Sequence, residues 1–197
     1  MRVDLVDTQT EQEAVRRVVD FAQSSDQLDW IQGRGWNQVL WDSNEFPSAV
    51  SLDAALSDKP VWLSRVDGHA GWANSAAMEL AGVDRRSEDP DGGQIIRDED
   101  GNPTGVFIDN AMALIRSQIP AISMEEQKFA LRTAMLELAK QGLTSVHDAG
   151  AGSDTIEAYK QLLDDGPLPI RVNVMLSAGD SFYEQRLAEG HYRSADD

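Results

Sequence analysis

The chain has 197 residues and a formal net charge of −17, and hydrophobic and charged residues make up 41% and 26% of it. This composition is typical of a globular protein that can bury a core, in one domain or in one domain with a small second one. The negative charge argues against a nucleic-acid partner, whose phosphates need lysine and arginine, and against an anionic membrane surface. We interpret the surplus of carboxylates as a solubility feature.

The sequence contains no cysteine, which excludes a disulfide framework, a thiolate metal site and a cysteine nucleophile. It holds no run of about 18 apolar residues, so no membrane span is predicted. The N-terminal segment lacks a basic region followed by an apolar one, so we predict no signal peptide and a cytoplasmic protein. A P-loop, a G-x-S-x-G elbow and an H-E-x-x-H metal motif are also absent from the sequence.

The first predicted element is a helix over residues 11–23. Thr10 to Glu13 form a capping-box pattern, in which a threonine precedes a glutamate by three positions. Apolar residues then recur at helical spacing, which predicts one buried face.

The segment over residues 30–41 holds three of the five tryptophans, together with Gly33, Gly35 and Arg34. The glycines indicate backbone with positive φ or a close approach to another group. One interpretation is an aromatic wall of a ligand pocket, with Arg34 binding an anion or a carbonyl group. The alternative is an irregular loop whose tryptophans fill the core.

A strand is predicted over residues 61–66, and it leads into Asp67-Gly68-His69. Arg65 and Asp67 are two positions apart, so they lie on the same side of an extended segment. A capped helix is predicted soon afterwards, from Asn74 or Ser75. The spacing therefore predicts a polar trio, Arg65, Asp67 and His69, at a strand-to-helix junction.

Two short strands, over residues 94–97 and 104–108, are predicted to form a β-hairpin. The six residues between them, 98–103, have the composition of a turn. Their acidic side chains do not match a calcium loop, so we interpret them as a solvated turn. A helix over residues 110–119 follows.

Ser123 opens a second capping box, before an amphipathic helix that ends at Gly142. Two strands are predicted after it, over residues 143–148 and 170–177, with a helix between them. Strand, crossover helix and strand within about thirty residues form a βαβ unit, which implies parallel pairing of the strands.

The first of these strands ends in His147 and Asp148. In parallel α/β folds the chemistry lies beyond the carboxyl ends of the strands, so both residues are candidates for a functional site. With His69 they would offer the histidine and carboxylate ligands that zinc prefers. The alternatives are a core histidine bonded to backbone at 147 and a cap of the next turn at 148.

Four motifs occur in order along the chain. They are Trp30-Ile31-x-Gly33-x-Gly35-Trp36, Arg65-x-Asp67-Gly68-His69 with Asn74-Ser75, Gly92-Gly93 with Gly105-Val106, and Gly142-Leu143-Thr144-Ser145-Val146-His147-Asp148. Together they resemble the branch of the metal-dependent amidohydrolase superfamily that includes N-substituted formamide deformylases. The resemblance extends from about Val3 to Ser177.

This resemblance implies an α/β fold that is part of a (β/α)₈ barrel, namely its strands 2 and 3, with an inserted α+β subdomain. Residues 1–24 would be a helix leading from the first barrel strand, residues 25–120 the inserted subdomain, and residues 121–197 a truncated βαβ portion of the barrel. The implied reaction is hydrolysis of an amide or related C–N bond by a hydroxide activated on one or two divalent metals, with zinc as the expected metal.

The resemblance also implies which residues form the site. A small-molecule amide-type substrate would be bound by Arg65, Asp67, His69, Trp36 and Trp41. Asp148 is the implied metal ligand, and His147 is a second candidate. The family's remaining metal-binding motifs would lie outside residues 1–197, so we expect the isolated segment to be inactive and to bind no metal.

Two excised barrel strands would expose ladder edges and an apolar face, so we expect a homo-oligomer formed through these edges. Two hypotheses from other functional classes remain open. The chain would be a stand-alone binding module, whose tryptophan-rich segment and polar trio hold a small polar ligand without chemistry. Otherwise it would be an interaction protein, whose acidic surface meets a basic partner in a salt-dependent manner.

Overall fold

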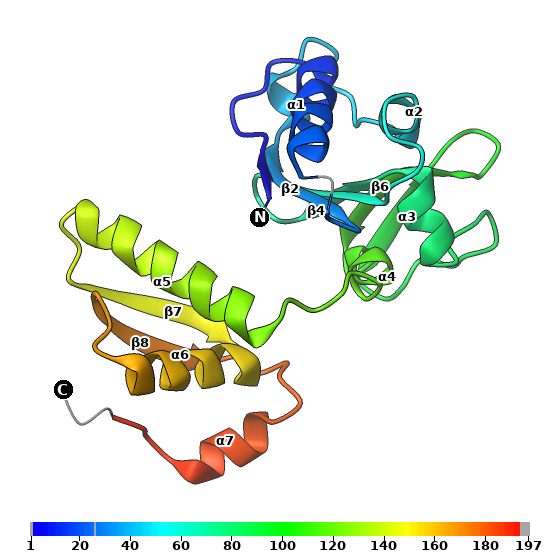
Figure 1. The fold of residues 1–197 in the computed structure, drawn as a ribbon. Coiled ribbons are helices and arrows are strands. Elements are labelled where there is room, and N and C mark those ends of the chain that lie inside the picture. Colours follow the sequence, from blue (N-terminus) through cyan, green and yellow to red (C-terminus); the bar gives the residue numbers. More distant parts are fainter. Residues whose placement is uncertain (1, 26, 194–197) are drawn as a thin grey trace. The chain divides into compact units, whose positions relative to one another are not determined.

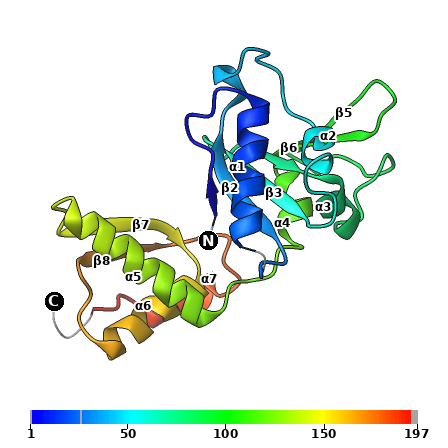
Figure 2. The ribbon, with the colours of Figure 1, turned by 45° about the horizontal axis from the view of Figure 1, so that its top comes forward.

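The computed structural model describes residues 2–25 and 27–193. The chain divides into two compact units, residues 1–120 and residues 121–197, which we call unit 1 and unit 2. Figures 1 and 2 show that each unit combines helices with a sheet of its own. None of the helices in the described residues is long and apolar enough to cross a membrane.

Unit 1 is built on a six-stranded mixed sheet with the order β1-β2-β3-β4-β6-β5. Its strands are β1 (Val3–Asp4), β2 (Ile31–Trp36), β3 (Val61–Arg65), β4 (Ala70–Ala73), β5 (Gly93–Arg97) and β6 (Pro103–Asp109). Strands β1, β2 and β3 are parallel, whereas β3–β4, β4–β6 and β5–β6 are antiparallel. The helical segments are α1 (Glu11–Ser24), the 3₁₀ helix η1 (Gln38–Leu40), α2 (Ala49–Asp53), α3 (Ser75–Leu80) and α4 (Met112–Arg116).

Helices and loops cover both faces of this sheet. Neighbouring residues of a strand point to opposite faces, so one strand contributes to the core on each side. On β3, Leu63 packs into the cluster that includes Val18 of α1, and Trp62 packs into the cluster that includes Met78 of α3 and Met112 of α4. Figure 1 shows α1 and α4 on opposite sides of the sheet. The predicted helix over residues 11–23 is confirmed as α1, and residues 2–24 belong to unit 1.

The tryptophan-rich segment is not an irregular loop, which was part of one of the two alternatives that the sequence left open. Residues 31–36 form β2, and η1 follows. Gly33 lies where β2 passes closely between its two neighbours. A Cβ atom at Gly33 would lie 2.5 Å from Cγ1 of Val3 and 2.7 Å from Cδ2 of Leu63. The glycine therefore reflects close packing of strands.

The predicted strand-to-helix junction after residue 66 is wrong, because β4 intervenes. β3 and β4 are antiparallel neighbours, so the residues between them form a hairpin turn, in which Gly68 has a φ of +80°. Asn74 then caps α3 and accepts a hydrogen bond from the Ala77 N–H at 3.1 Å. The predicted hairpin of β5 and β6 is confirmed.

Unit 2 contains α5 (Met124–Lys140), β7 (Ser145–Ala151), α6 (Ser153–Asp165), β8 (Arg171–Leu176) and α7 (Tyr183–Glu189). β7 and β8 are parallel, so the predicted βαβ unit is confirmed. Ser123 and Glu126 form both bonds of the predicted capping box. A single hydrophobic cluster joins the two long helices to the two strands. It includes Met135 of α5, Tyr159 of α6, Val146 of β7 and Val172 of β8.

β7 is longer than the sequence predicted. It continues past Asp148 to Ala151, and its pairing register with β8 shifts between Ala149 and Ala151. Gly150 has a φ of +96° at this shift, so the strand passes the predicted break as a bulge. His147 and Asp148 consequently lie inside the strand and not at its end.

Candidate functional site

Arg65, Asp67 and His69 are brought together by the β3–β4 turn. Nη1 of Arg65 donates a hydrogen bond to Oδ2 of Asp67 at 3.1 Å, and Oδ1 of Asp67 accepts one from the backbone N–H of His69 at 3.0 Å. The Asp67 carboxylate thus connects the other two residues. The Arg65 side chain is 20% exposed, and its Nε is buried with no hydrogen-bond partner among the described residues.

A fourth residue, Asp109, joins the trio from the end of β6. Nδ1 of His69 lies 2.7 Å from Oδ1 of Asp109, and the Asp109 N–H donates to the His69 carbonyl oxygen at 3.1 Å. The antiparallel register pairs Ala70 with Ile108, which sets His69 opposite Asp109. The sequence analysis missed Asp109 because it did not predict β4. The sequence did contain one indication of the role of Asp109, namely that its carboxylate comes directly after the predicted strand 104–108.

The corner that carries Asp109 is tightly built. Asp109 has a φ of +46°, a left-handed conformation that is uncommon for residues other than glycine. Gly93 pairs with Asp109 in the sheet, and a Cβ atom at Gly93 would lie 2.2 Å from the backbone nitrogen of Ala111. Nδ2 of Asn110 donates to the Asp91 carbonyl oxygen at 2.7 Å. The Gly92-Gly93 motif therefore allows the start of β5 to pass against this corner.

Asp109 also controls the charge of the site. Its hydrogen bond raises the pKa of His69 above the ordinary value of 6.5, and its negative charge acts in the same direction. Asp67 raises this pKa further, whereas desolvation and Arg65 lower it. Because the folded-state pKa is raised, the stabilisation from this pair is complete below the unfolded value. It is lost as pH rises through the folded value.

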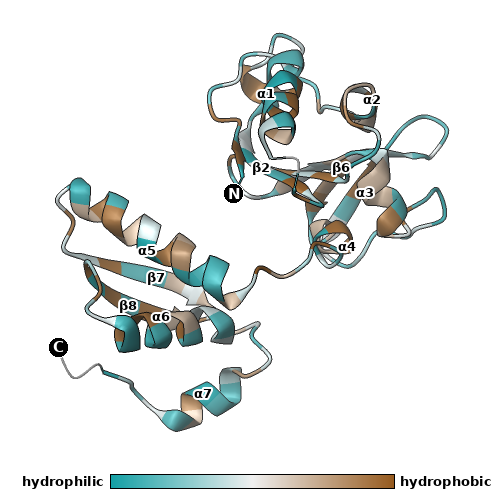
Figure 3. Cartoon of the chain, viewed as in Figure 1, coloured by the Kyte–Doolittle hydropathy of each residue, from teal (hydrophilic) through white to brown (hydrophobic). Residues whose placement is uncertain are grey.

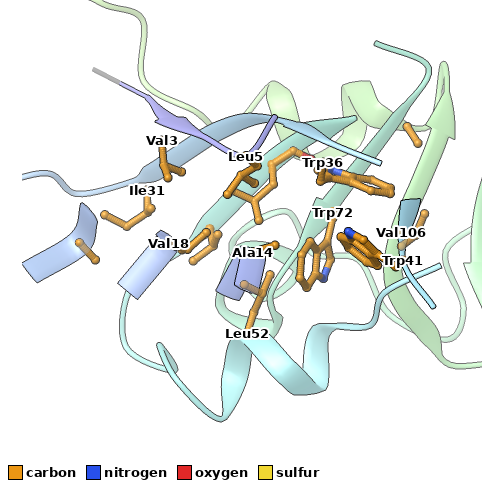
Figure 4. Packing of buried hydrophobic residues seen from close by; sticks show 14 residues of the cluster. Val3, Leu5, Ala14, Val18, Ile31, Trp36, Trp41, Leu52, Trp72 and Val106 are labelled. Carbon is orange, nitrogen blue, oxygen red and sulfur yellow. Dashed lines mark hydrogen bonds between the residues drawn. The ribbon is translucent and has the colours of Figure 1, made fainter. Parts of the chain in front are cut away.

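Trp36 and Trp41, the two predicted substrate-binding tryptophans, lie in the core of unit 1. They are 0% and 4% exposed, and Figure 4 shows both beside Trp72. The ring centroids of Trp36 and Trp41 are 6.1 Å apart. The indole N–H of Trp36 donates to the Leu63 carbonyl oxygen at 2.8 Å, and that of Trp41 donates to the Thr8 carbonyl oxygen at 3.1 Å. The core-filling alternative accounts for both residues.

In unit 2, His147 and Asp148 do not face each other, because neighbouring residues of a strand point to opposite faces. Asp148 is half-buried on the helix side, where Oδ2 accepts a hydrogen bond from the Tyr159 hydroxyl at 3.1 Å. Burial, and then the Asp148 charge, raise the pKa of Tyr159 to about 12. His147 is exposed.

The described residues do not make a metal site on their own. Within residues 2–25 and 27–193, no three histidine, aspartate or glutamate side chains gather closely enough to hold a metal ion. Zinc takes three or four protein ligands. β7 offers two possible ligands, His147 and Asp148, and their side chains lie on opposite faces of the strand. A metal bound here would need ligands from outside the described residues.

We expect Tyr159→Phe to destabilise unit 2 by about 1 kcal/mol, because it removes one hydrogen bond and leaves the half-buried Asp148 carboxylate without it. Hydrogen exchange of the β7 and α6 amides measures this loss locally. Exposed Tyr192→Phe is the matched control and should leave exchange unchanged. Equal protection from hydrogen exchange in the wild type and in both variants would show that the Tyr159–Asp148 hydrogen bond does not stabilise unit 2.

The α/β arrangement of this chain is found in solved structures of other proteins. The chain superposes on the crystal structure of an uncharacterized metal-dependent hydrolase from Pyrococcus horikoshii OT3 with a TM-score of 0.68 and 24% identity. The match covers 98% of this chain and 36% of that one. At this identity the likeness establishes the fold alone.

A family model described as "Amidohydrolase family" matches residues 1–197, and the chain therefore belongs to the amidohydrolase family. It is 42% identical over 138 residues to the protein LONG AFTER FAR-RED 3 of Arabidopsis thaliana, covering 70% of this chain and 24% of that protein. It is 29% identical over 161 residues to the N-substituted formamide deformylase of Arthrobacter pascens, covering 80% of this chain and 30% of that enzyme. The resemblance found in the motifs is confirmed, and the chain spans less than a third of the length of these relatives.

Proposed function

We propose that the chain is a segment of a metal-dependent amidohydrolase that hydrolyses an amide or related C–N bond. The observation that carries the proposal is the family match over residues 1–197. The similarity to an N-substituted formamide deformylase supports an amide-type substrate. The complete enzyme would use a divalent metal, with zinc as our expectation, held mainly by ligands outside this chain.

In this proposal β7 and β8 are the second and third strands of a (β/α)₈ barrel, and unit 1 contains the inserted subdomain. The parallel pairing of β7 and β8 and the helix between them support the barrel assignment. Asp148 is the proposed metal ligand of this segment. Catalysis requires a metal in an open site, so the isolated chain is expected to be inactive.

Arg65, Asp67 and His69 are the proposed substrate-binding residues. The turn fixes Arg65 and the His69 backbone through one carboxylate, and it leaves the His69 side chain 74% exposed. Such a prearranged set of donors suits the oxygen atoms of a small amide. A site held by secondary structure on both sides loses little freedom when it binds.

The test is hydrolysis of a panel of N-substituted formamides and longer N-acyl amides by the complete enzyme that carries this chain. We expect turnover that is lost on dialysis against a chelator and restored by zinc. His69→Gln should lower kcat/KM about tenfold or more, because it removes the hydrogen bond that the His69 ring makes to the substrate. His191→Gln, an exposed position in unit 2, is the control. Failure to cleave any C–N bond, with metal bound, would refute the proposal.

We also propose that the isolated chain self-associates through the free edge of β8. The Arg171 N–H donates to the Thr144 carbonyl oxygen on β7 at 3.0 Å, so the N–H of Val174 points to the other edge. That edge borders a cavity of about 1070 Å³ in unit 2. Phe129 is 72% exposed, and Figure 3 shows other hydrophobic residues along α5.

Val174→Pro is expected to reduce this self-association, because proline removes the N–H that an added strand would use. Val174→Thr keeps the N–H and serves as the control. Sedimentation velocity at several concentrations measures the effect. A wild-type chain that remains monomeric throughout would contradict the proposal.

A further inference from the structure

We propose that Asp109 is a positioning residue for substrate binding. It holds the His69 ring by Nδ1 and leaves Nε2 to meet an acceptor oxygen of the substrate. The inference rests on the proposed function, in which His69 binds an amide-type substrate. Asp109 belongs to none of the motifs that identified the other site residues, and its role follows from the sheet geometry.

Three hydrogen bonds fix His69 in place. The Asp67 carboxylate accepts the His69 N–H at 3.0 Å, the His69 carbonyl oxygen accepts the Asp109 N–H at 3.1 Å, and the ring nitrogen Nδ1 lies 2.7 Å from the Asp109 carboxylate. In the described part of the chain, Nε2 is the polar atom of this residue that has no partner. The ring is therefore oriented by the protein, and Nε2 remains for a ligand.

The backbone conformation around Asp109 places its carboxylate beside the His69 ring. Its φ of +46° is sparsely populated, and such conformations persist where the surroundings impose them, often at functional sites. Gly93 permits the close approach, since any Cβ atom there would collide with the backbone of Ala111. Aspartate tolerates left-handed backbone better than most residues, but this does not explain why its side chain meets His69.

The pairing also defines what Nε2 can do. A neutral ring with its proton on Nδ1 donates a hydrogen bond to Asp109 and has a lone pair at Nε2. A protonated ring carries a donor N–H at Nε2 as well. Asp109 and Asp67 both favour the protonated ring, and Arg65 opposes it. In its protonated form the ring offers a charged donor suited to an amide carbonyl or carboxylate oxygen. Binding weakens as pH rises through the folded-state pKa of His69.

The first experiment tests the positioning without any activity. The titration of the His69 ring is followed by NMR in the 197-residue chain, with His69→Gln used to assign its signal among the three histidines. Asp109→Asn should lower the titration midpoint of His69. Asp91→Asn, which removes a carboxylate at the same corner, should leave it unchanged. An unchanged midpoint in Asp109→Asn would overturn the inference.

A measurement on the wild-type chain covers the case in which Asp109→Asn does not fold. Nitrogen-15 shifts of the imidazole report which ring nitrogen carries the proton above the midpoint. We expect the proton on Nδ1, where the Asp109 carboxylate accepts it. A neutral His69 protonated at Nε2 would overturn the inference.

The second experiment uses the complete enzyme and separates positioning from a general structural role. Asp109→Asn should raise KM about tenfold with kcat nearly retained, because binding is lost equally in the ground and transition states. The double variant Asp109→Asn/His69→Gln should be no worse than His69→Gln, since Asp109 acts through His69. Additive losses would overturn the positioning role. An unaffected His69→Gln enzyme would instead refute the proposed substrate site.

Discussion

Trp36→Ala is expected to destabilise unit 1 by about 3 to 5 kcal/mol, the range found when large buried side chains are truncated. Trp36 is 0% exposed, and its ring packs against Trp41 and Trp72 with centroids 6.1 and 6.2 Å away. Its indole N–H also donates to the Leu63 carbonyl oxygen, so truncation removes that donor as well. The variant loses both packing and a buried hydrogen bond.

Denaturant unfolding followed by tryptophan fluorescence measures this loss selectively, because all five tryptophans lie within residues 1–120. Trp36→Ala leaves four of them as reporters. Val39→Ala is the matched control, since Val39 is 58% exposed and should change the free energy of unfolding by no more than about 0.5 kcal/mol. A loss in Trp36→Ala as small as that control would contradict a core role and favour the pocket-wall interpretation.

Gly93→Ala is expected to cost about 3 kcal/mol, at the upper end for overpacking. The added Cβ atom would lie 2.2 Å from the Ala111 nitrogen and 2.9 Å from the Asn110 carbonyl carbon. Both are backbone atoms, so a side-chain rotation cannot relieve the contact. Because Gly93 pairs with Asp109, the same change should also disturb the environment of His69.

The matched control is Gly68→Ala in the β3–β4 turn. Gly68 has a φ of +80° with open space around its missing Cβ, so alanine there costs about 1 kcal/mol of backbone strain. Fluorescence-detected unfolding compares the two variants, and the His69 NMR signal reports the local disturbance. Equal losses in both variants would contradict the close-approach role of Gly93.

The sequence predicted elements wherever a local signal was strong. The capping pattern at Thr10, the capping box at Ser123 and the turn composition before Pro103 gave α1, α5 and the β5–β6 hairpin. The length of the helical connection between the two strands correctly predicted that β7 and β8 are parallel. These features depend on neighbours in the chain, which explains why a sequence can reveal them.

The sequence did not reveal features that depend on distant contacts. β4 is four residues long, and its sequence, Ala-Gly-Trp-Ala, has little strand propensity, so pairing with β3 and β6 makes it a strand. Without β4, nothing placed Asp109 beside His69. The bulge at Gly150 lets β7 continue where the small residues suggested a break. The grouping of Arg65, Asp67 and His69 could thus be predicted from the sequence. The position of Asp109 beside them could be recognised only from the fold.

We propose that this chain contributes substrate-binding residues and two strands to an amidohydrolase, and that its described residues do not complete a metal site. The most direct test is the metal content of the purified chain together with isothermal titration of zinc. We expect less than about a tenth of an equivalent and no tight binding, because a stable zinc site needs three or four converging ligands. One equivalent of tightly bound zinc would contradict the claim. It would show that residues of this chain hold a metal without ligands from elsewhere, and that the chain is a metalloprotein in its own right.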